Sequence, residues 1–528
     1  MAERFDAVVV GGGHNGLTCA AYLARGGLKV CVLERRHVIG GAAVTEEVFP
    51  GFRWSVASYV MSLLQPRIIR ELELERHGFK VLPASSLFVP FPDGSSFVYW
   101  DDERKTCAEI AKHSRKDAEA FPVFNRYIQE SAAIVRQLLW ETPVDPSSRR
   151  WKDIRETAAL VWKYRRVAGK MYRIIDLVTQ SVSDYLDRWF ESDVIKGVLS
   201  YYSSIGTFAG PRTPGTAYVL LHHIMGEHEG AGGWGFVRGG MGAISRAIAA
   251  AATERGAVIR TEAEIDRIQV ANGIATGVVL KSGEVVEAKL VVSNADAKRT
   301  FLKLVGEAAL PPEFVAEVKA FRTFSAAFKI NLAVDAPPAY TAFRKDIGID
   351  YPSYVHIGHS VDYLEKAYDD AKYGRWSERP FITPVVPTIV DDTLAPKGKH
   401  VVNLFGGHAP YQLKDRTWEQ SRDAFFKTVV DTLTDYAPNF RDSILHAQVL
   451  TPPDLEALIG LPQGHIFHGE LAPDQLFFMR PVPHYADYRT PIRSLYQCGA
   501  STHPGGGVMG VPGYNAAREI LKDWKRRR

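Results

Sequence analysis

The feature that most constrains this chain is a glycine-rich turn that follows directly on an apolar run near the N-terminus. Residues 5–10 read FDAVVV, a continuous apolar run expected of a strand that is buried on both faces of a sheet. Gly11, Gly13 and Gly16 follow with the spacing GxGxxG. In this pattern the first glycine permits a tight turn, the second lets a pyrophosphate approach the backbone, and the third lets a helix pack closely on the strand. Residues 5–36 are therefore predicted to form a strand, helix, strand unit whose helix N-terminus binds a pyrophosphate.

An acidic residue at the end of the second predicted strand narrows the choice of dinucleotide. LKVCVLE, residues 28–34, is another apolar run, and it ends in Glu34. A carboxylate at this position can bind the two hydroxyls of a ribose, and it would repel the 2′-phosphate of NADP. The residues themselves leave NAD and FAD as candidates.

The residues that follow Glu34 resemble those of the FAD-dependent amine oxidase superfamily, in particular its phytoene desaturase and carotenoid isomerase branch. The shared pattern is an acid, a basic residue two positions later, and a Gly-Gly pair that passes close to the flavin. Here these positions are Glu34, Arg36, Gly40 and Gly41. Ala42 departs from the pattern, because amine oxidases usually have an arginine there, so one contact to the flavin is missing or comes from elsewhere. The resemblance implies that the cofactor is FAD. Cys498 lies in a predicted buried strand, which favours noncovalent binding.

Two further segments carry the same resemblance. Residues 495–524 are similar to the second flavin motif of the desaturase branch, in which a glycine-rich helix start points N–H groups at the isoalloxazine carbonyls. Residues 235–270 are similar to the segment whose strand holds adenine with backbone groups near Ile268. The positions that match the C-terminal motif are Gly499, Ala500, Gly506, Gly507, Val508 and Met509.

These motifs predict an α/β fold with a discontinuous domain plan. A chain of 528 residues exceeds the size at which one core normally keeps growing, so two domains are expected. The Rossmann-like FAD-binding domain would comprise residues 1–65, 232–300 and 485–528. An α+β substrate domain, with a helical part and a sheet, would comprise residues 66–231 and 301–484. Residues 87–100 read as a hairpin whose aromatic side chains could either line an apolar pocket or pack in the core.

Two residues are candidates for catalysis. Residues 325–335 alternate, so that Phe328, Ile330 and Leu332 share an apolar face and Lys329 lies on the other. In amine oxidases a strand of similar pattern carries a lysine that holds a water against flavin N5. A desolvated lysine there would have a lowered pKa and could assist reoxidation by oxygen or a proton transfer; the alternative is a solvent-facing lysine. His503, within the C-terminal motif, is either an active-site group or structural.

Composition and charge exclude several other classes of protein. A net charge of +4 is too small for a nucleic-acid-binding protein of this length. The four cysteines form no CxxC pair, and the HxxH of His465 and His468 lacks further ligands, so no metal site is expected. No secretory signal and no membrane-spanning run is present in the sequence, so we expect a cytoplasmic protein in a reducing compartment.

A basic segment is the one feature that suggests a membrane. Residues 149–173 contain nine Lys or Arg and two acids, with apolar residues at helical spacing, so a basic amphipathic helix is predicted. This helix would either lie solvated over the substrate domain or dock on an anionic membrane or partner.

Together these patterns predict an FAD-dependent oxidoreductase that transfers hydride from a C–H bond of a small molecule to flavin N5. The resemblance to desaturases implies an elongated apolar substrate, whereas Lys329 favours an amine. There are two alternatives from other classes: a redox-neutral polyene isomerase and a non-enzymatic binding protein of the same fold. The intact phosphate turn and Glu34 argue against the binding protein.

Overall fold

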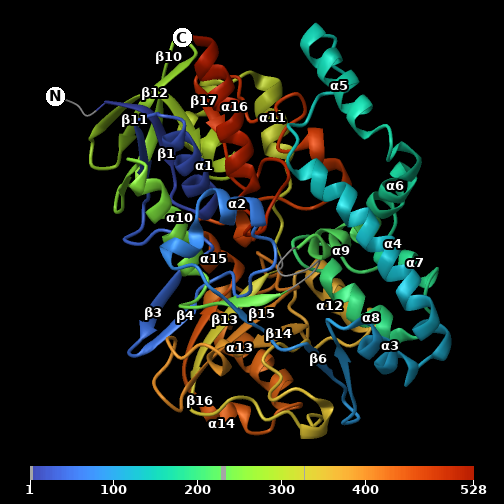
Figure 1. The fold of residues 1–528 in the computed structure, drawn as a ribbon. Coiled ribbons are helices and arrows are strands. Elements are labelled where there is room, and N and C mark those ends of the chain that lie inside the picture. Colours follow the sequence, from blue (N-terminus) through green and yellow to red (C-terminus); the bar gives the residue numbers. More distant parts are fainter. Residues whose placement is uncertain (1–3, 227–233, 326, 528) are drawn as a thin grey trace.

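A parallel sheet forms the centre of the upper part of the molecule in Figure 1. The computed structural model describes residues 4–226, 234–325 and 327–527. The strands of the sheet come from three distant parts of the chain, and their order is β9-β2-β1-β12-β17, all parallel. This arrangement confirms the predicted α/β, Rossmann-like fold. The strands are β1 (Arg4–Val10), β2 (Val30–Leu33), β9 (Val258–Arg260), β12 (Val285–Ser293) and β17 (Leu495–Gln497).

The apolar run of β1 is buried on both faces of this sheet. Ala7 and Val9 belong to one hydrophobic cluster, and Val8 and Val10 belong to another on the opposite face. Helix α1 (His14–Arg25) packs against α10 (Gly242–Glu254) and the C-terminal helix α16 (Val511–Arg527). The hairpin predicted at Asn272 is present, since β10 (Ile265–Ala271) pairs antiparallel with β11 (Ile274–Leu280), which leads into β12.

A second, antiparallel sheet lies below the first in Figure 1, in the order β14-β15-β13-β16. Phe328, Ile330 and Leu332 of its central strand pack in one cluster with Phe425 and Val429 of α13, so the apolar face predicted for this strand is covered by a helix. The strands are β13 (Phe328–Val334), β14 (Ile382–Val385), β15 (His400–Gly406) and β16 (Ile444–Leu450), and the helices around them are α12 (Val361–Lys372), α13 (Trp418–Thr434), α14 (Phe440–Ser443) and α15 (Pro452–Ile459).

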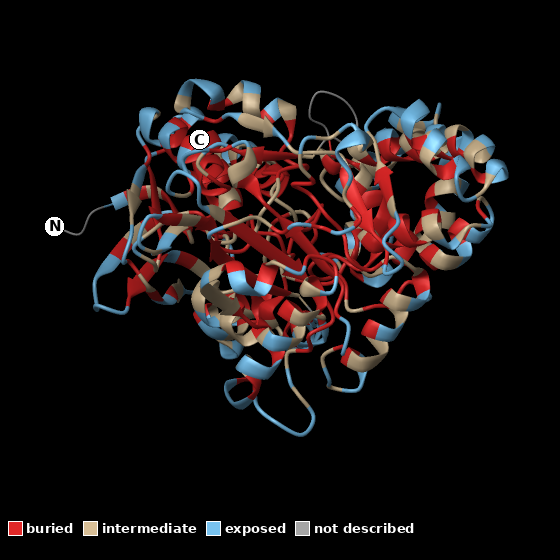
Figure 2. Ribbon diagram, turned by 90° about the horizontal axis from the view of Figure 1, so that it is seen from below, coloured by how far each residue is buried: buried red, intermediate tan, exposed pale blue. Residues whose placement is uncertain are grey.

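A helical lobe lies to the right of the two sheets in Figure 1. Its inner surfaces are buried, whereas its outer surfaces are largely exposed (Figure 2). The lobe contains α3 (Glu103–Ala111), α4 (Arg115–Leu139), α5 (Trp151–Tyr164), α6 (Met171–Thr179), α7 (Val182–Asp187), α8 (Asp193–Ser203) and α9 (Thr216–Ile224). Shorter elements connect the three parts: β3 (Thr45–Phe49), β4 (Phe52–Ser55), α2 (Pro66–Glu71), β5 (Val81–Pro83), β6 (Leu87–Pro90), β7 (Ser96–Tyr99), β8 (Gly235–Val237) and α11 (Pro312–Ala320).

The basic segment 149–173 is not one helix, so that prediction is wrong. Helix α5 ends at Tyr164, a short 3-10 turn covers Ala168–Lys170, and α6 begins at Met171. The N–H of Val167 donates to the carbonyl of Tyr164 at 2.9 Å, a three-residue spacing that closes the helix. The glycine at position 169 disfavours continuation of the helix. The domain boundary predicted between residues 231 and 232 lies outside the described residues.

Candidate active site

A cleft runs past the carboxyl ends of the parallel strands, where open α/β sheets bind their ligands. One end lies at the glycine turn and the tip of β2, and the other reaches the face of the second sheet. The residues that line it come from all three parts of the fold: 10–15, 33–35, 41–42, 57–63, 205, 223, 234, 263–265, 294–304, 405, 459–468, 500 and 507–508, with gaps inside some of these ranges.

The glycine turn is shaped by close approaches that a side chain would block. Gly11 has a φ of +93°, which favours glycine. A Cβ on Gly13 would lie 2.8 Å from Nδ2 of Asn294, and a Cβ on Gly16 would lie 2.4 Å from the carbonyl oxygen of Gly11. Gly11 and Gly13 line the cleft, whereas Gly16 lies behind it and allows α1 to pack against the turn. The backbone is therefore open to a phosphate at the N-terminus of α1.

Glu34 is held in place at the adenosine end of the cleft. Its Oε2 accepts the N–H of Gly12 at 2.8 Å, and its Oε1 accepts the N–H of Arg36 at 2.9 Å. Each carboxylate oxygen keeps a lone pair for a ribose hydroxyl. The side chain of Arg36 turns away from the cleft and forms an ion pair with Glu46 at 2.9 Å, while Arg35 lines the cleft. The basic group near the cofactor is thus Arg35, one position before the residue that the family pattern indicated.

The Gly-Gly pair and the segment that leads into the predicted adenine strand are held at the cleft by backbone hydrogen bonds. Gly40 donates to the carbonyl of Gly12 at 2.9 Å, which brings Gly41 into the cleft lining. Ile268 is buried in β10 and does not line the cleft. The lining from this part of the chain is residues 263–265, where the N–H of Ala263 donates to the carbonyl of Glu34 at 2.9 Å.

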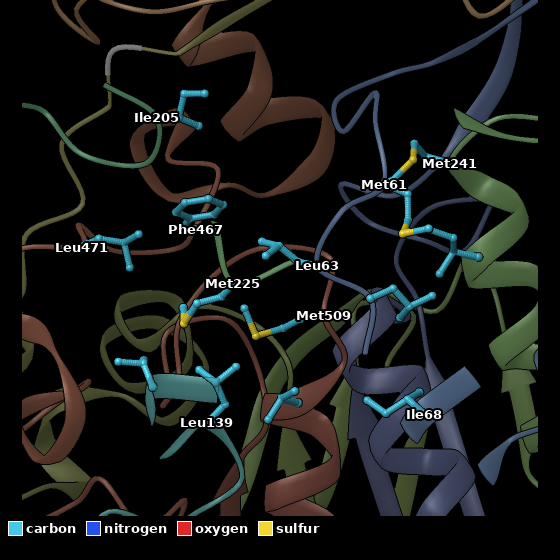
Figure 3. Packing of buried hydrophobic residues seen from close by; sticks show 14 of the residues in the cluster. Met61, Leu63, Ile68, Leu139, Ile205, Met225, Met241, Phe467, Leu471 and Met509 are labelled. Atoms are coloured by element: carbon cyan, nitrogen blue, oxygen red, sulfur yellow. The ribbon is translucent and has the colours of Figure 1, made fainter. Parts of the chain in front are cut away.

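The C-terminal motif approaches the cleft from the other side. Ala500, Gly507 and Val508 line it. A Cβ on Gly499 would lie 2.6 Å from the carbonyl oxygen of Asn294, and one on Gly506 would lie 2.1 Å from Cβ of Phe467, so both glycines permit close packing. Met509 is fully buried behind the motif, in the apolar cluster that also contains Leu63 and Phe467, both of which line the cleft (Figure 3).

Three histidines that line the cleft carry no charge at neutral pH. Burial lowers the pKa of His14 to about 4, that of His223 to about 4 and that of His468 to about 3. His14 shares a hydrogen bond with the carbonyl of Gly507 at 3.1 Å, so it links the two glycine motifs. None of the three was predicted for the site from the sequence, although His14 lies inside the GxGxxG motif and could have been found there.

Lys329 lies one layer beneath the cleft. Its Nζ is buried, donates to Oδ1 of Asn403 at 3.0 Å and to Oδ1 of Asn331, and lies 5.7 Å from the ring centroid of Tyr59. The ring of Tyr59 stacks on Phe405 at 5.3 Å, and both rings line the cleft, whereas Lys329 does not. Burial lowers the pKa of Lys329 well below its usual value. The solvent-facing alternative is therefore wrong.

His503 also lies outside the cleft lining. Its Nε2 donates to the carbonyl of Leu138 at 3.0 Å, and burial lowers its pKa to about 4. Tyr488 donates from its hydroxyl to the backbone carbonyl of His503 at 3.0 Å. These contacts link the C-terminal motif to α4, a structural role.

A second cavity of about 530 Å³ adjoins the cleft and shares His223 and Trp234 with it. Its Tyr99 and Trp100 come from the end of the 87–100 hairpin, whereas Phe88 and Phe97 of the hairpin are fully buried and do not line the cavity. Some aromatic side chains of the hairpin therefore line a pocket, and others pack in the core. The other apolar residues that line the cavity include Leu82, Phe121, Phe124, Ile128, Leu199, Tyr202, Leu220, Ile224 and Tyr354. Besides His223, its polar residues are Ser85, Ser86, Asp101, Glu103, Asn125 and Gln129.

The residues of the cleft fit FAD. The glycine turn and Glu34 match a pyrophosphate and a ribose, and the stacked rings of Tyr59 and Phe405 suit a planar apolar group. Two buried polar atoms of the lining, Oδ1 of Asn15 and Nδ1 of His468, have no partner among the described residues and can bond to a polar ligand. Within the same residues no group of three or more His, Cys, Asp or Glu is placed to hold a metal ion.

Comparison with known proteins agrees with this geometry. A family model described as flavin containing amine oxidoreductase matches residues 16–521. Pyridine nucleotide-disulfide oxidoreductase domain-containing protein 2 of Rattus norvegicus is 42% identical, over 99% of this chain and 94% of that protein. A limonene dehydrogenase subunit of Castellaniella defragrans is 27% identical, over 99% and 95%, and the neurosporene-forming phytoene desaturase of Cereibacter sphaeroides is 26% identical, over 96% and 92%.

Solved structures share the architecture. Cyclohexylamine oxidase from Brevibacterium oxydans superposes with a TM-score of 0.57 at 16% identity, covering 99% of this chain and all of that one. This likeness concerns the fold. Among the described helices, none has the length and apolar character that crossing a membrane would require.

Proposed function

Because the chain belongs to the flavin containing amine oxidoreductase family, we propose that it oxidises a C–H bond of an elongated, apolar small molecule. The protein is an FAD-dependent oxidoreductase of the phytoene desaturase-like group. The bound FAD supplies a ring that accepts a hydride from carbon. The observation that supports an apolar substrate is the aromatic cavity that meets the cleft at His223 and Trp234.

The protein's own residues would bind the cofactor at three places. The N–H groups at the start of α1 would bind the pyrophosphate, Glu34 would bind the ribose, and Gly507 and Val508 would contact the flavin. The cofactor would be bound noncovalently. Cys498, the cysteine nearest to the C-terminal motif, is fully buried and does not line the cleft.

Apolar side chains would exclude water where the two cavities meet. Leu63, Ile205 and Phe467 line the cleft on this side, and their burial lowers the local dielectric (Figure 3). Such a lining favours a hydrocarbon over a strongly hydrated molecule. The relative named as part of a limonene dehydrogenase is consistent with a hydrocarbon substrate.

His223 would accept the proton that the substrate loses. Its Nδ1 bonds to the carbonyl of Val219 at 2.8 Å, and because a carbonyl only accepts, Nδ1 carries the hydrogen. The lone pair therefore resides on Nε2, in a ring that lines both cavities. The imidazole is neutral above about pH 4, because burial lowers its pKa to about 4.

An amine-bearing substrate is the second candidate. Two carboxylates, Asp101 and Glu103, line the aromatic cavity and could pair with an ammonium group. Burial also lowers the pKa of Lys329, which lies beneath the ring of Tyr59, so its ammonium releases a proton more readily than that of an ordinary lysine.

The experiment is an anaerobic titration of the purified holoprotein with a polyene, a monoterpene and a primary amine, followed by the visible flavin absorbance. Bleaching by either hydrocarbon alone supports the proposal, and bleaching by the amine alone supports the second candidate. A flavin band that none of the three compounds bleaches contradicts oxidation of either class.

A pair of variants locates the substrate. Ile224→Trp fills the aromatic cavity, whereas Val123→Trp adds the same ring on the exposed side of α4. We expect only Ile224→Trp to weaken bleaching, with the flavin spectrum unchanged in both. Equal bleaching rates would place the substrate elsewhere.

A further inference from the structure

The outer face of α5 is an apolar surface that the described chain leaves uncovered. Trp151, Ile154, Val161 and Trp162 are 79%, 46%, 65% and 68% exposed, and together with Ala158 they share one side of the helix. No residue of α5 is buried. Large apolar residues at such exposure are costly in water unless another surface covers them. We refer to these five residues as the outer face of α5.

Positive charge surrounds this face. Residues 149–173 contain nine Lys or Arg and only two acids. Lys163, Lys170 and Arg173 pair with carboxylates of α4 or of the residues just after it. Within the described part of the chain, five arginines form no ion pair with a carboxylate: Arg149, Arg150, Arg155, Arg165 and Arg166. Arg165 instead lies 4.0 Å over the ring of Trp162, so a cation and an indole of this surface are already side by side.

The opposite side of α5 faces the protein. Lys152, Glu156 and Leu160 line a hollow of about 900 Å³ between this helix and the C-terminal segment. Tyr164 donates from its hydroxyl to Glu141 at 2.9 Å and fixes the end of the helix. The helix lies at the upper right edge of the molecule in Figure 1, away from both sheets. Its orientation is thus set by polar contacts on one side only.

We propose that α5 docks the protein on a membrane surface that contains anionic lipid, with its outer face inserted among the headgroups. Tryptophan favours the boundary between water and hydrocarbon, and arginine bonds to lipid phosphates while its stem stays in apolar surroundings. A basic polar side with Trp on the apolar side is typical of helices that lie in the plane of the interface. The proposal is independent of the substrate.

Vesicle flotation tests the proposal with the full-length holoprotein. We expect the protein to float with vesicles of phosphatidylcholine and phosphatidylserine, to bind vesicles of phosphatidylcholine alone far more weakly, and to dissociate as salt is raised. The variant Trp151→Ser with Trp162→Ser should weaken binding about tenfold or more, because two large apolar rings no longer enter the interface. The control Tyr373→Ser with Phe324→Ser removes two exposed rings elsewhere and should bind as the wild type does.

Charge is tested separately. Arg155→Gln with Arg166→Gln should lower affinity for the anionic vesicles about 25-fold, at roughly fivefold for each basic residue near the surface. Lys397→Gln with Lys399→Gln removes two exposed lysines at another site and should leave affinity unchanged.

Two outcomes would overturn the proposal. One is a wild type that stays unbound with both kinds of vesicle. The other is a wild type whose mass in solution is that of a dimer, together with a tryptophan variant whose mass is that of a monomer. This result would assign the outer face of α5 to a second copy of the chain. Because the replaced residues lie outside both cavities, reduction of the flavin by substrate should be unchanged, which separates this test from that of the proposed function.

Discussion

The buried amine of Lys329 predicts a specific dependence of stability on pH. Its Nζ has two amide oxygens and an aromatic ring around it, and no carboxylate within the described residues pairs with it. Burial therefore lowers the pKa of the folded lysine well below its usual 10.5, whereas the unfolded chain keeps that value. Between the two pKa values the unfolded state holds one more proton than the folded state.

The variant Lys329→Met makes this difference in bound protons measurable, as a difference in the free energy of unfolding between the wild type and the variant. Above pH 10.5 neither state is charged, and the wild type should be the more stable, by about 2–6 kcal/mol, because Met leaves the amide oxygens of Asn331 and Asn403 without their donor at roughly 1–3 kcal/mol each. As pH falls from 10.5 toward the folded pKa, the wild type loses about 1.4 kcal/mol per pH unit relative to the variant. The advantage of the wild type therefore shrinks on acidification and can reverse.

The assay is urea unfolding of the wild type and the variant, followed by tryptophan fluorescence at a series of pH values. Lys397→Met, which removes an exposed lysine, controls for the loss of any one amine. Parallel pH profiles for the wild type and Lys329→Met would refute the reasoning, since they would mean that folding leaves the protonation of this lysine unchanged.

Three further predictions concern the cofactor, the substrate and the C-terminal helix. Gly16→Ala places a Cβ 2.4 Å from a backbone oxygen and should lower the affinity of the apoprotein for FAD about 10- to 100-fold in a fluorescence titration, whereas Gly169→Ala, with open space around it, should not. His223→Phe should slow reduction of the flavin by substrate about tenfold or more without changing FAD affinity, and a wild-type rate that changes near pH 6.5 would contradict its pKa of about 4. Arg489→Met leaves three partly buried carboxylates, those of Asp487, Glu519 and Asp523, without their shared guanidinium, and it should destabilise the protein by about 2–4 kcal/mol. The measurement is the melting temperature, which should fall. An unchanged melting temperature would show that these ion pairs contribute nothing to stability.

The sequence alone determined the parts of the site that depend on short-range geometry. The apolar run before Gly11, the spacing to Gly16 and the acid at Glu34 identified the strand, turn and helix, because each requirement is met within a few residues of backbone. The hairpins at Asp93 and Asn272 and the alternating faces of β13 were predictable for the same reason.

Only the tertiary structure decided which side chains face the cleft. Arg35 rather than Arg36 reaches it because Glu46, on β3, holds Arg36 away. Lys329 is one layer deep because Tyr59, 270 positions earlier in the sequence, covers it. His223 and the aromatic cavity have no local sequence signal, since their lining comes from segments distant in the chain. A pattern fixes the conformation of its own residues, but the direction in which a side chain meets a ligand is set by whatever distant segment packs against it.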